Sequence, residues 1–161
     1  MSVDKNKAVV RRFNEAMKQF WRTGDTGLFD EVLAPDYVQH WPGFPSDREG
    51  YLRTLQMFRT AFPDLEKTTE DMLADGDKVV DRVTVRGTHA GEMLGLPPTG
   101  KRMTITEMHI ARLADRKIVE RWGEWDQLGL LQQIGAIPTP GFAAILGPNG
   151  LEPRNQADRR A

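Results

Sequence analysis

The 161-residue sequence predicts an α+β domain in which N-terminal helices pack against a mainly antiparallel sheet. Apolar residues recur with a helical period of about 3.6 as far as Pro63 and then alternate with the strand period of about 2. The strand segments follow one another through short turns, which favours an antiparallel meander over a doubly wound parallel sheet. We therefore expect one domain over residues 1–138.

Three helices and one extended segment are expected before Pro63. Residues 5–21 carry apolar side chains at i, i+3 and i+4 spacing, which is typical of a helix that faces a core. A short second helix over residues 28–33 precedes an extended segment at 37–41. Ser46 begins a capping-box pattern, so we expect it to be the N-cap of the third helix, which Pro63 ends.

Four strands and a last helix are expected after Pro63. The alternating segments are residues 65–74, 78–88, 103–113 and 117–125, and the helix covers 127–134. Asp115 and Arg116 form a two-residue turn between the last two strands. Residues 139–161 are rich in proline and glycine, so we expect a tail that is mobile or docked on a partner subunit.

Composition excludes several classes of function. The 22 basic and 23 acidic side chains nearly cancel, which argues against nucleic-acid binding. The absence of cysteine excludes thiolate metal sites and disulfides, and the three histidines lack zinc spacing, so we expect no metal site. No apolar run reaches the roughly 20 residues that span a membrane, and no signal peptide is recognisable, so a cytoplasmic location is expected.

The last predicted hairpin gathers candidate catalytic residues. If Ala114 pairs with Lys117 across the turn, the register places His109 opposite Trp122. One face of the hairpin then carries Glu107, His109, Trp122, Glu124 and Asp126. An imidazole beside a carboxylate can hold and move one proton, which indicates acid–base chemistry.

The same residues also fit a non-catalytic interpretation. A face rich in glutamate is typical of the solvated side of a sheet, and Asp126 directly precedes a helix, where aspartate is a favoured N-cap. The aromatic side chains Phe20 and Phe58 are core residues that can also line a ligand pocket. Both interpretations stay open at this point.

Several ordered motifs give the sequence a family resemblance. They are Leu33-Ala-Pro-Asp-Tyr-Val-Gln-His40, Gly87-Thr-His-Ala-Gly91, Gly95-Leu-Pro-Pro-Thr-Gly-Lys101, Ile118-Val-Glu-Arg-Trp122 and Asp126 with residues 128–135. Over residues 6–138 the sequence resembles the SnoaL-like polyketide cyclase family. The resemblance implies a cone-shaped barrel, shared with ketosteroid isomerase and nuclear transport factor 2, in which helices pack against a curved sheet around a cavity. Arg116 stands where this family usually has a turn glycine.

The resemblance also implies a reaction and a site. The family's cyclases close a ring by intramolecular aldol condensation, without metal or cofactor, and their acid–base residues match Asp126 and His109. We expect a small apolar substrate and a homodimer. The expected substrate-binding residues are His40, Trp41, Trp122, Phe20, Phe58 and Glu107.

Two alternatives accompany the cyclase hypothesis. An isomerase or dehydratase would use the same aspartate and would need a donor such as Tyr37 or His109. A non-catalytic ligand-binding or dimerisation module would use Asp126 only as an N-cap.

Overall fold

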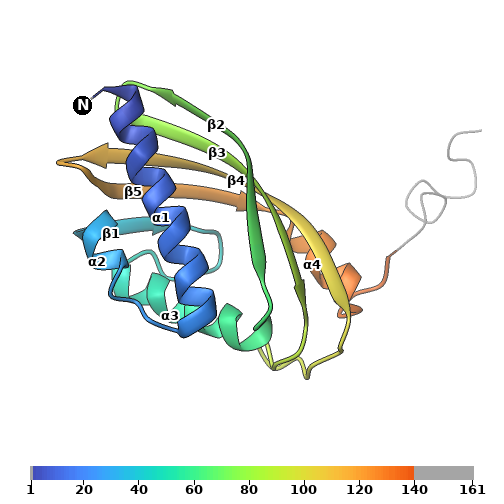
Figure 1. Ribbon diagram of the computed structural model, residues 1–161. Coiled ribbons are helices and arrows are strands. Elements are labelled where there is room, and N and C mark those ends of the chain that lie inside the picture. The colour runs from blue at the N-terminus through green and yellow to red at the C-terminus, as the bar shows by residue number, and fades with distance from the viewer. Residues whose placement is uncertain (1, 140–161) are drawn as a thin grey trace, which may run out of the picture.

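A five-stranded sheet curves around the N-terminal helices in the computed structural model, which describes residues 2–139 (Figure 1). The helices are α1 (Val3–Thr23), α2 (Phe29–Val32), α3 (Arg48–Ala61) and α4 (Gln127–Ile134), and the strands are β1 (Leu33–His40), β2 (Glu66–Asp75), β3 (Lys78–Thr88), β4 (Arg102–Ala114) and β5 (Lys117–Trp125). The strand order is β1-β5-β4-β3-β2, so the sheet is open rather than a closed barrel. The α+β class is confirmed, and the predicted tail beyond residue 139 lies outside the described residues.

Helix α1 crosses the hollow face of the sheet (Figure 1). The side chain of Ser2 caps its first turn, and Gly24 ends it with a left-handed φ of 80°. Its buried stripe is Asn6, Val9, Val10, Phe13, Ala16, Met17, Phe20 and Trp21. This long amphipathic helix is as predicted, and it forms one wall of the interior. Among the described residues, no helix is long and apolar enough to cross a membrane.

Strand β1 was only partly predicted from the sequence. It spans eight residues, where we expected an extended segment at 37–41, and it pairs in parallel with β5. Periodicity cannot reveal such a partner, because the two strands lie about 80 residues apart in the chain. The pairing is interrupted between Leu33 and Val38, so Pro35, which has no N–H, lies in an irregular edge strand.

Helix α3 begins one residue later than the capping-box pattern predicts. Asp47 is the N-cap, and its Oδ1 accepts a hydrogen bond from the Gly50 N–H at 2.8 Å. The prediction of Ser46 as the cap is wrong because its carbonyl oxygen is engaged with β1, where it accepts from the Gln39 N–H at 2.7 Å.

The β4–β5 hairpin contains a bulge that changes the predicted faces. The two-residue turn is confirmed, with φ values of 47° and 65° at Asp115 and Arg116. The first pairs are also as predicted, but the register shifts between Arg112 and Leu113, so that Arg112 pairs with Glu120. His109 consequently lies opposite Gly123 instead of Trp122.

The bulge reverses the orientation of every later β5 side chain. Arg121 and Gly123 are buried on the hollow side, with Trp125 partly buried beside them. The prediction that Trp122 and Glu124 share a face with His109 is therefore wrong.

The loop after β3 packs tightly against the end of α3. The N–H groups of Ala90 and Gly91 both donate to the carbonyl oxygen of Ala61, at 3.0 and 3.1 Å. A Cβ on residue 91 would lie 2.0 Å from the carbonyl oxygen of Thr60. Only glycine allows this approach of two backbones.

The first prediction follows from that contact. Gly91→Ala should lower the free energy of unfolding by about 1–3 kcal/mol, because backbone must move to admit the methyl group. Urea unfolding measures the change. Gly87→Ala is the matched control, since its Cβ would meet its nearest neighbour at an ordinary 3.4 Å. Equal stability of the two variants would contradict the close packing.

Candidate active site

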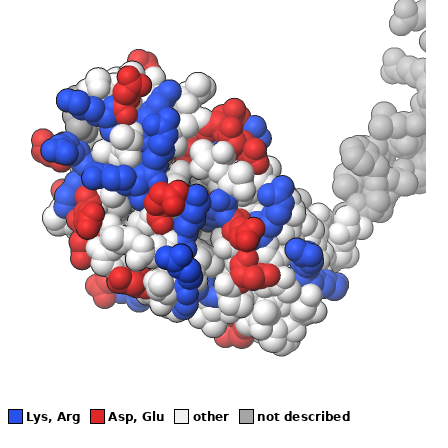
Figure 2. All heavy atoms as spheres, viewed as in Figure 1, with Lys and Arg blue, Asp and Glu red and all other residues white. Residues whose placement is uncertain are grey.

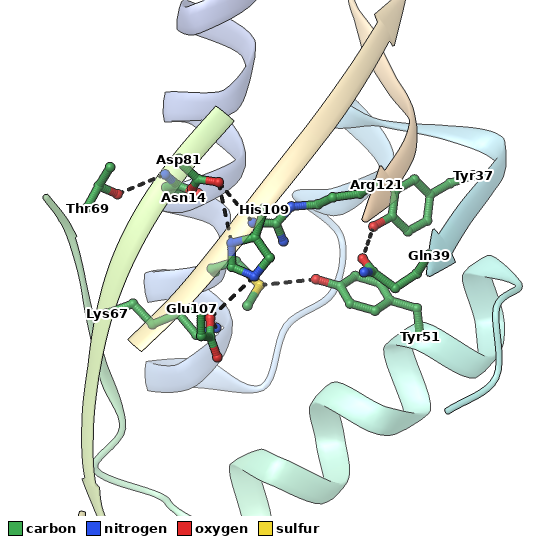
Figure 3. Close-up of polar contacts among 11 residues, drawn as sticks. Asn14, Tyr37, Gln39, Tyr51, Lys67, Thr69, Asp81, Glu107, His109 and Arg121 are labelled. Atoms are coloured by element: carbon green, nitrogen blue, oxygen red, sulfur yellow. Dashed lines mark hydrogen bonds and ion pairs between the residues drawn. The ribbon is translucent and has the colours of Figure 1, made fainter. Parts of the chain in front are cut away.

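Four ionisable side chains from three adjacent strands meet on the hollow face of the sheet (Figure 3). They are Asp81 of β3, Glu107 and His109 of β4, and Arg121 of β5, with exposed fractions of 2%, 7%, 2% and 3%. Strand alternation and the β5 bulge direct all four inward. Buried charged groups are rare unless they are paired, so this cluster stands out from the surrounding core.

His109 lies between two carboxylates. Its Nδ1 is 3.4 Å from Asp81 Oδ1, and its Nε2 is 3.5 Å from Glu107 Oε2 (Figure 3). Both separations exceed that of a direct hydrogen bond. Burial lowers the pKa of His109, with the charge of Arg121 adding to the effect, and the two carboxylates oppose it only in part. The imidazole is therefore neutral near pH 7.

Two cations balance the two carboxylates. Arg121 Nη2 is 3.6 Å from Asp81 Oδ1, and its guanidinium lies over the Phe13 ring at 4.7 Å. Lys67 Nζ of β2 is 2.6 Å from Glu107 Oε2. The attraction between opposite charges in a buried ion pair roughly offsets the cost of removing them from water. The two carboxylates and the two cations can therefore be buried together.

The cations keep both carboxylates ionised. Burial alone would raise the pKa of Asp81, but contact with His109 and the charge of Arg121 outweigh it and hold that pKa below its usual range. Burial also raises the pKa of Glu107, but Lys67 and His109 outweigh this effect and hold that pKa below its usual value. An ionised Asp81 favours the His109 tautomer with its proton on Nδ1. The ionised Glu107 beside Nε2 favours the opposite tautomer, so the two carboxylates compete for the single proton of the neutral imidazole.

A cleft of about 530 Å³ opens onto this cluster. It lies between α1 and the strands β2 and β3, and its lining includes Asp81, His109 and Arg121. Four basic and four acidic side chains line the cleft, although basic side chains form a nearly continuous band over the surface around α1 (Figure 2). The cleft therefore gives a ligand access to the buried imidazole without strong selection for its net charge.

A second hollow lies deeper and is almost filled by side chains. It holds about 30 Å³, which is room for a water-sized group. Its lining is largely apolar, with Lys67 and Glu107 as the charged members. The main aromatic contributors are Trp21, Trp41, Phe58, Phe62 and Trp125.

Comparison with known proteins identifies the family. Residues 11–134 match the profile of the SnoaL-like polyketide cyclases. The chain belongs to the SnoaL-like polyketide cyclase family. Nogalonic acid methyl ester cyclase from Streptomyces nogalater is 27% identical over 125 residues, covering 74% of this chain and 92% of that protein. Aklanonic acid methyl ester cyclase DauD from Streptomyces sp. (strain C5) is 29% identical, covering 94% and 93%.

Solved structures agree with this family assignment. IdmH, a proposed polyketide cyclase from Streptomyces antibioticus, is 35% identical, with a TM-score of 0.71 and coverage of 81% of this chain and 98% of that one. AclR, a proposed hydroxylase from Streptomyces galilaeus, is 27% identical, with a TM-score of 0.76 and 89% coverage of each chain. Proteins of this fold are thus described both as a cyclase and as a hydroxylase, so the fold alone does not determine the reaction. The reaction has to be inferred from the residues of the site.

The two catalytic residues predicted for this SnoaL-like protein lie in different settings. His109 lies in the buried cluster, together with Glu107, which was predicted to bind substrate. Asp126 is exposed, and its Oδ1 accepts a hydrogen bond from the Gly129 N–H at 2.8 Å as the N-cap of α4. The structure thus does not bring Asp126 and His109 together, and a catalytic role for Asp126 stays a prediction.

The other predicted binding residues divide between the interior and the outer face. Trp41 and Phe58 line the inner hollow, and Phe20 is fully buried in the core. His40 and Trp122 stack on each other with ring centres 5.2 Å apart, and His40 Nε2 is 2.9 Å from Glu120 Oε1. That pair belongs to the face opposite His109, so its predicted contact with the substrate lacks structural support.

Sequence reasoning missed Asp81, Lys67 and Arg121. Asp81 could have been found from the strand alternation, because it falls on the same buried side of β3 as Val79, Val83 and Val85. An acidic residue at a core position of a strand usually has a paired partner or a function. Arg121 had no such signal, since its face depends on the bulge.

The second prediction concerns pH and stability. The folded pKa of His109 is below the ordinary value of about 6.5, so the unfolded chain takes up the proton first as the pH falls. The contribution of this residue to stability is therefore present above about pH 6.5 and decreases as the pH falls below it. Urea unfolding between about pH 7 and pH 5 should show a smaller loss for His109→Gln than for the wild type. Equal losses would contradict the account.

Proposed function

We propose that this protein is a polyketide cyclase that closes a ring by intramolecular aldol condensation, with His109 as the general base. The observation that carries the proposal is a neutral imidazole, held beside the ionised Asp81, on the wall of an open cleft. The two relatives named above are methyl ester cyclases, which supports ring closure over other proton transfers. The substrate class is accordingly a polycyclic polyketide ester with an acidic C–H flanked by carbonyl groups.

In the first step, His109 Nε2 removes the proton from this C–H group. The electron pair of the broken C–H bond passes into an enolate, and the imidazole becomes an imidazolium. Asp81 and Glu107, at 3.4 and 3.5 Å from the two ring nitrogens, stabilise the positive charge at that moment. The lowered pKa of His109 is compatible with this proton transfer, because an efficient general base has a pKa near the working pH.

In the second step, the enolate carbon attacks a carbonyl carbon of the same molecule. A C–C bond forms, the carbonyl oxygen becomes an alkoxide, and the proton returns from His109 Nε2 to that oxygen. Atoms and electrons balance without an oxidant or a reductant. The cleft contributes by holding the chain folded, which removes much of the entropy cost of ring closure.

Asp81 acts as a positioning residue for His109. In this mechanism its carboxylate holds the imidazole proton on Nδ1, and Arg121 keeps that carboxylate ionised. The arrangement follows the same logic as the acid–histidine pairs of hydrolases, in which the carboxylate orients the imidazole.

The third prediction separates the two candidate bases. His109→Gln should lower kcat for closure of an aklanonic or nogalonic acid methyl ester by about 100-fold or more. Asp126→Asn is the matched variant, because asparagine preserves the N-cap of α4, and it should leave kcat close to the wild-type value. Product structure is determined by NMR, which distinguishes a new C–C bond from isomerisation or dehydration.

A different pattern would reassign the chemistry. A large loss of kcat in Asp126→Asn with normal folding would return the base to Asp126, as the sequence predicted. Unchanged turnover in His109→Gln would contradict the proposed mechanism. Wild-type protein that closes no ring on either ester would count against the proposed substrate class.

We also propose that the outer face of the sheet forms a homodimer. Met108 and Ile110, on the outer side of β4, are 54% and 40% exposed. Apolar side chains that are adjacent on one face of a sheet are typical of a subunit contact.

The fourth prediction tests this contact. Met108→Glu should shift the protein from dimer to monomer in sedimentation velocity, because a charge would be buried between the subunits. Leu128→Glu, at an equally exposed site on α4, is the control that should leave the dimer intact. A wild-type protein that sediments as a monomer would contradict the proposal.

A further inference from the structure

The indole of Trp41 has a buried donor without an acceptor. The side chain is 7% exposed, and its Nε1 has no hydrogen-bond partner within residues 2–139. Aromatic contacts with Tyr51, Phe44 and Phe58 hold the ring in place. A buried N–H without an acceptor is costly by about 1–3 kcal/mol, and buried indoles usually have a partner.

The unpaired N–H lies beside His109, and Gly123 makes this possible. A Cβ on residue 123 would be 2.1 Å from Trp41 Nε1 and 2.9 Å from His109 Cδ2. The indole nitrogen and the imidazole edge therefore converge on one point above the β5 backbone. Any side chain at this position would separate them, because real Cβ atoms do not approach other atoms so closely.

The space around Trp41 admits an oxygen but not a ring. The inner hollow that Trp41 lines holds about 30 Å³, whereas the outer cleft that His109 lines holds about 530 Å³. A flat ligand fits the cleft but not the hollow, and Lys67 lines both spaces, so a carbonyl or hydroxyl group of such a ligand would pass beside Lys67 to reach the indole. The ammonium of Lys67 is paired with Glu107 at 2.6 Å, whereas the indole N–H of Trp41 has no acceptor.

We propose that the indole N–H of Trp41 is the hydrogen-bond donor to the enolate oxygen that forms when His109 takes the proton. The inference rests on the proposed function for the reaction step, and it assigns a catalytic role to Trp41 and a positioning role to Gly123. The substrate presents its acidic C–H to His109 Nε2 and the adjacent carbonyl oxygen to Trp41 Nε1. As the C–H bond breaks, negative charge moves onto that oxygen, where a fixed donor in a buried site is most effective.

The geometry also defines a ligand class outside catalysis. A planar phenol resembles the enol form of the substrate, and its phenolate resembles the enolate. We expect the site to bind phenolates more tightly than phenols, with the phenolic proton passing to His109 and the oxygen accepting from Trp41. Preference for the ionised form lowers the pKa of the bound phenol.

The fifth prediction uses substituted 4-nitrophenols, whose ionised form is distinguished by its visible absorbance. Wild-type protein should lower the pKa of the bound phenol relative to the free compound. Trp41→Phe keeps an aromatic ring and removes the N–H, so it should reduce the preference for phenolate over phenol by about tenfold, which is about one unit in the bound pKa. Gly123→Ala should act in the same direction, because its methyl group displaces the indole.

Trp125→Phe is the matched control, because Trp125 lines the same hollow but is only partly buried, so its N–H is not a buried donor without an acceptor. It should change the affinity for phenol and phenolate alike and leave the bound pKa as in the wild type. A bound pKa that is the same in Trp41→Phe and wild type overturns the inference, and so does a wild-type protein that binds no phenolate. Because the assay needs no turnover, a lowered bound pKa in a protein without ring closure would contradict the proposed function but would still support Trp41 as a donor to a bound oxyanion.

Discussion

The compensation of charge around His109 is the constraint on which the rest of the interior depends. Asp81 and Glu107 are buried as anions, and Arg121 and Lys67 offset them from the neighbouring strands β5 and β2. Removing any one of the four would leave an unpaired buried charge, which typically costs about 3–5 kcal/mol. Burial keeps the imidazole between the carboxylates neutral, and the charge of Arg121 adds to this effect. Folding and proton chemistry therefore depend on the same contacts.

The β5 bulge determines which side chains take part. Without the extra residue, Trp122 and Glu124 would face the helices, and Arg121 would face outward. The bulge brings Arg121 inward and places Gly123 opposite His109. It thereby supplies the cation that balances Asp81 and the gap that Trp41 occupies. A local irregularity of one residue thus sets the charge balance of the interior.

Most of the fold could be predicted from local patterns, and the site could not. The helix over residues 5–21, the turn at Asp115 and Arg116, and the end of α4 at Gly135 follow from periodicity, turn chemistry and capping. The parallel β1–β5 pair and the bulge depend on contacts between distant segments, which leave no periodic signal. Asp126 was grouped with His109 by a register that holds only for the first pairs of the hairpin, whereas Asp81 was readable from its phase on β3.

If His109 is the general base proposed above, its imidazole is neutral at pH 7 and its Nε2 carries no proton. Nitrogen-15 NMR of the histidine side chains, titrated across the pH range, tests this most directly, with His109→Gln providing the assignment. The account predicts the Nδ1–H tautomer at neutral pH and a pKa below the usual value of about 6.5. An imidazolium at neutral pH, or a proton on Nε2, would contradict it.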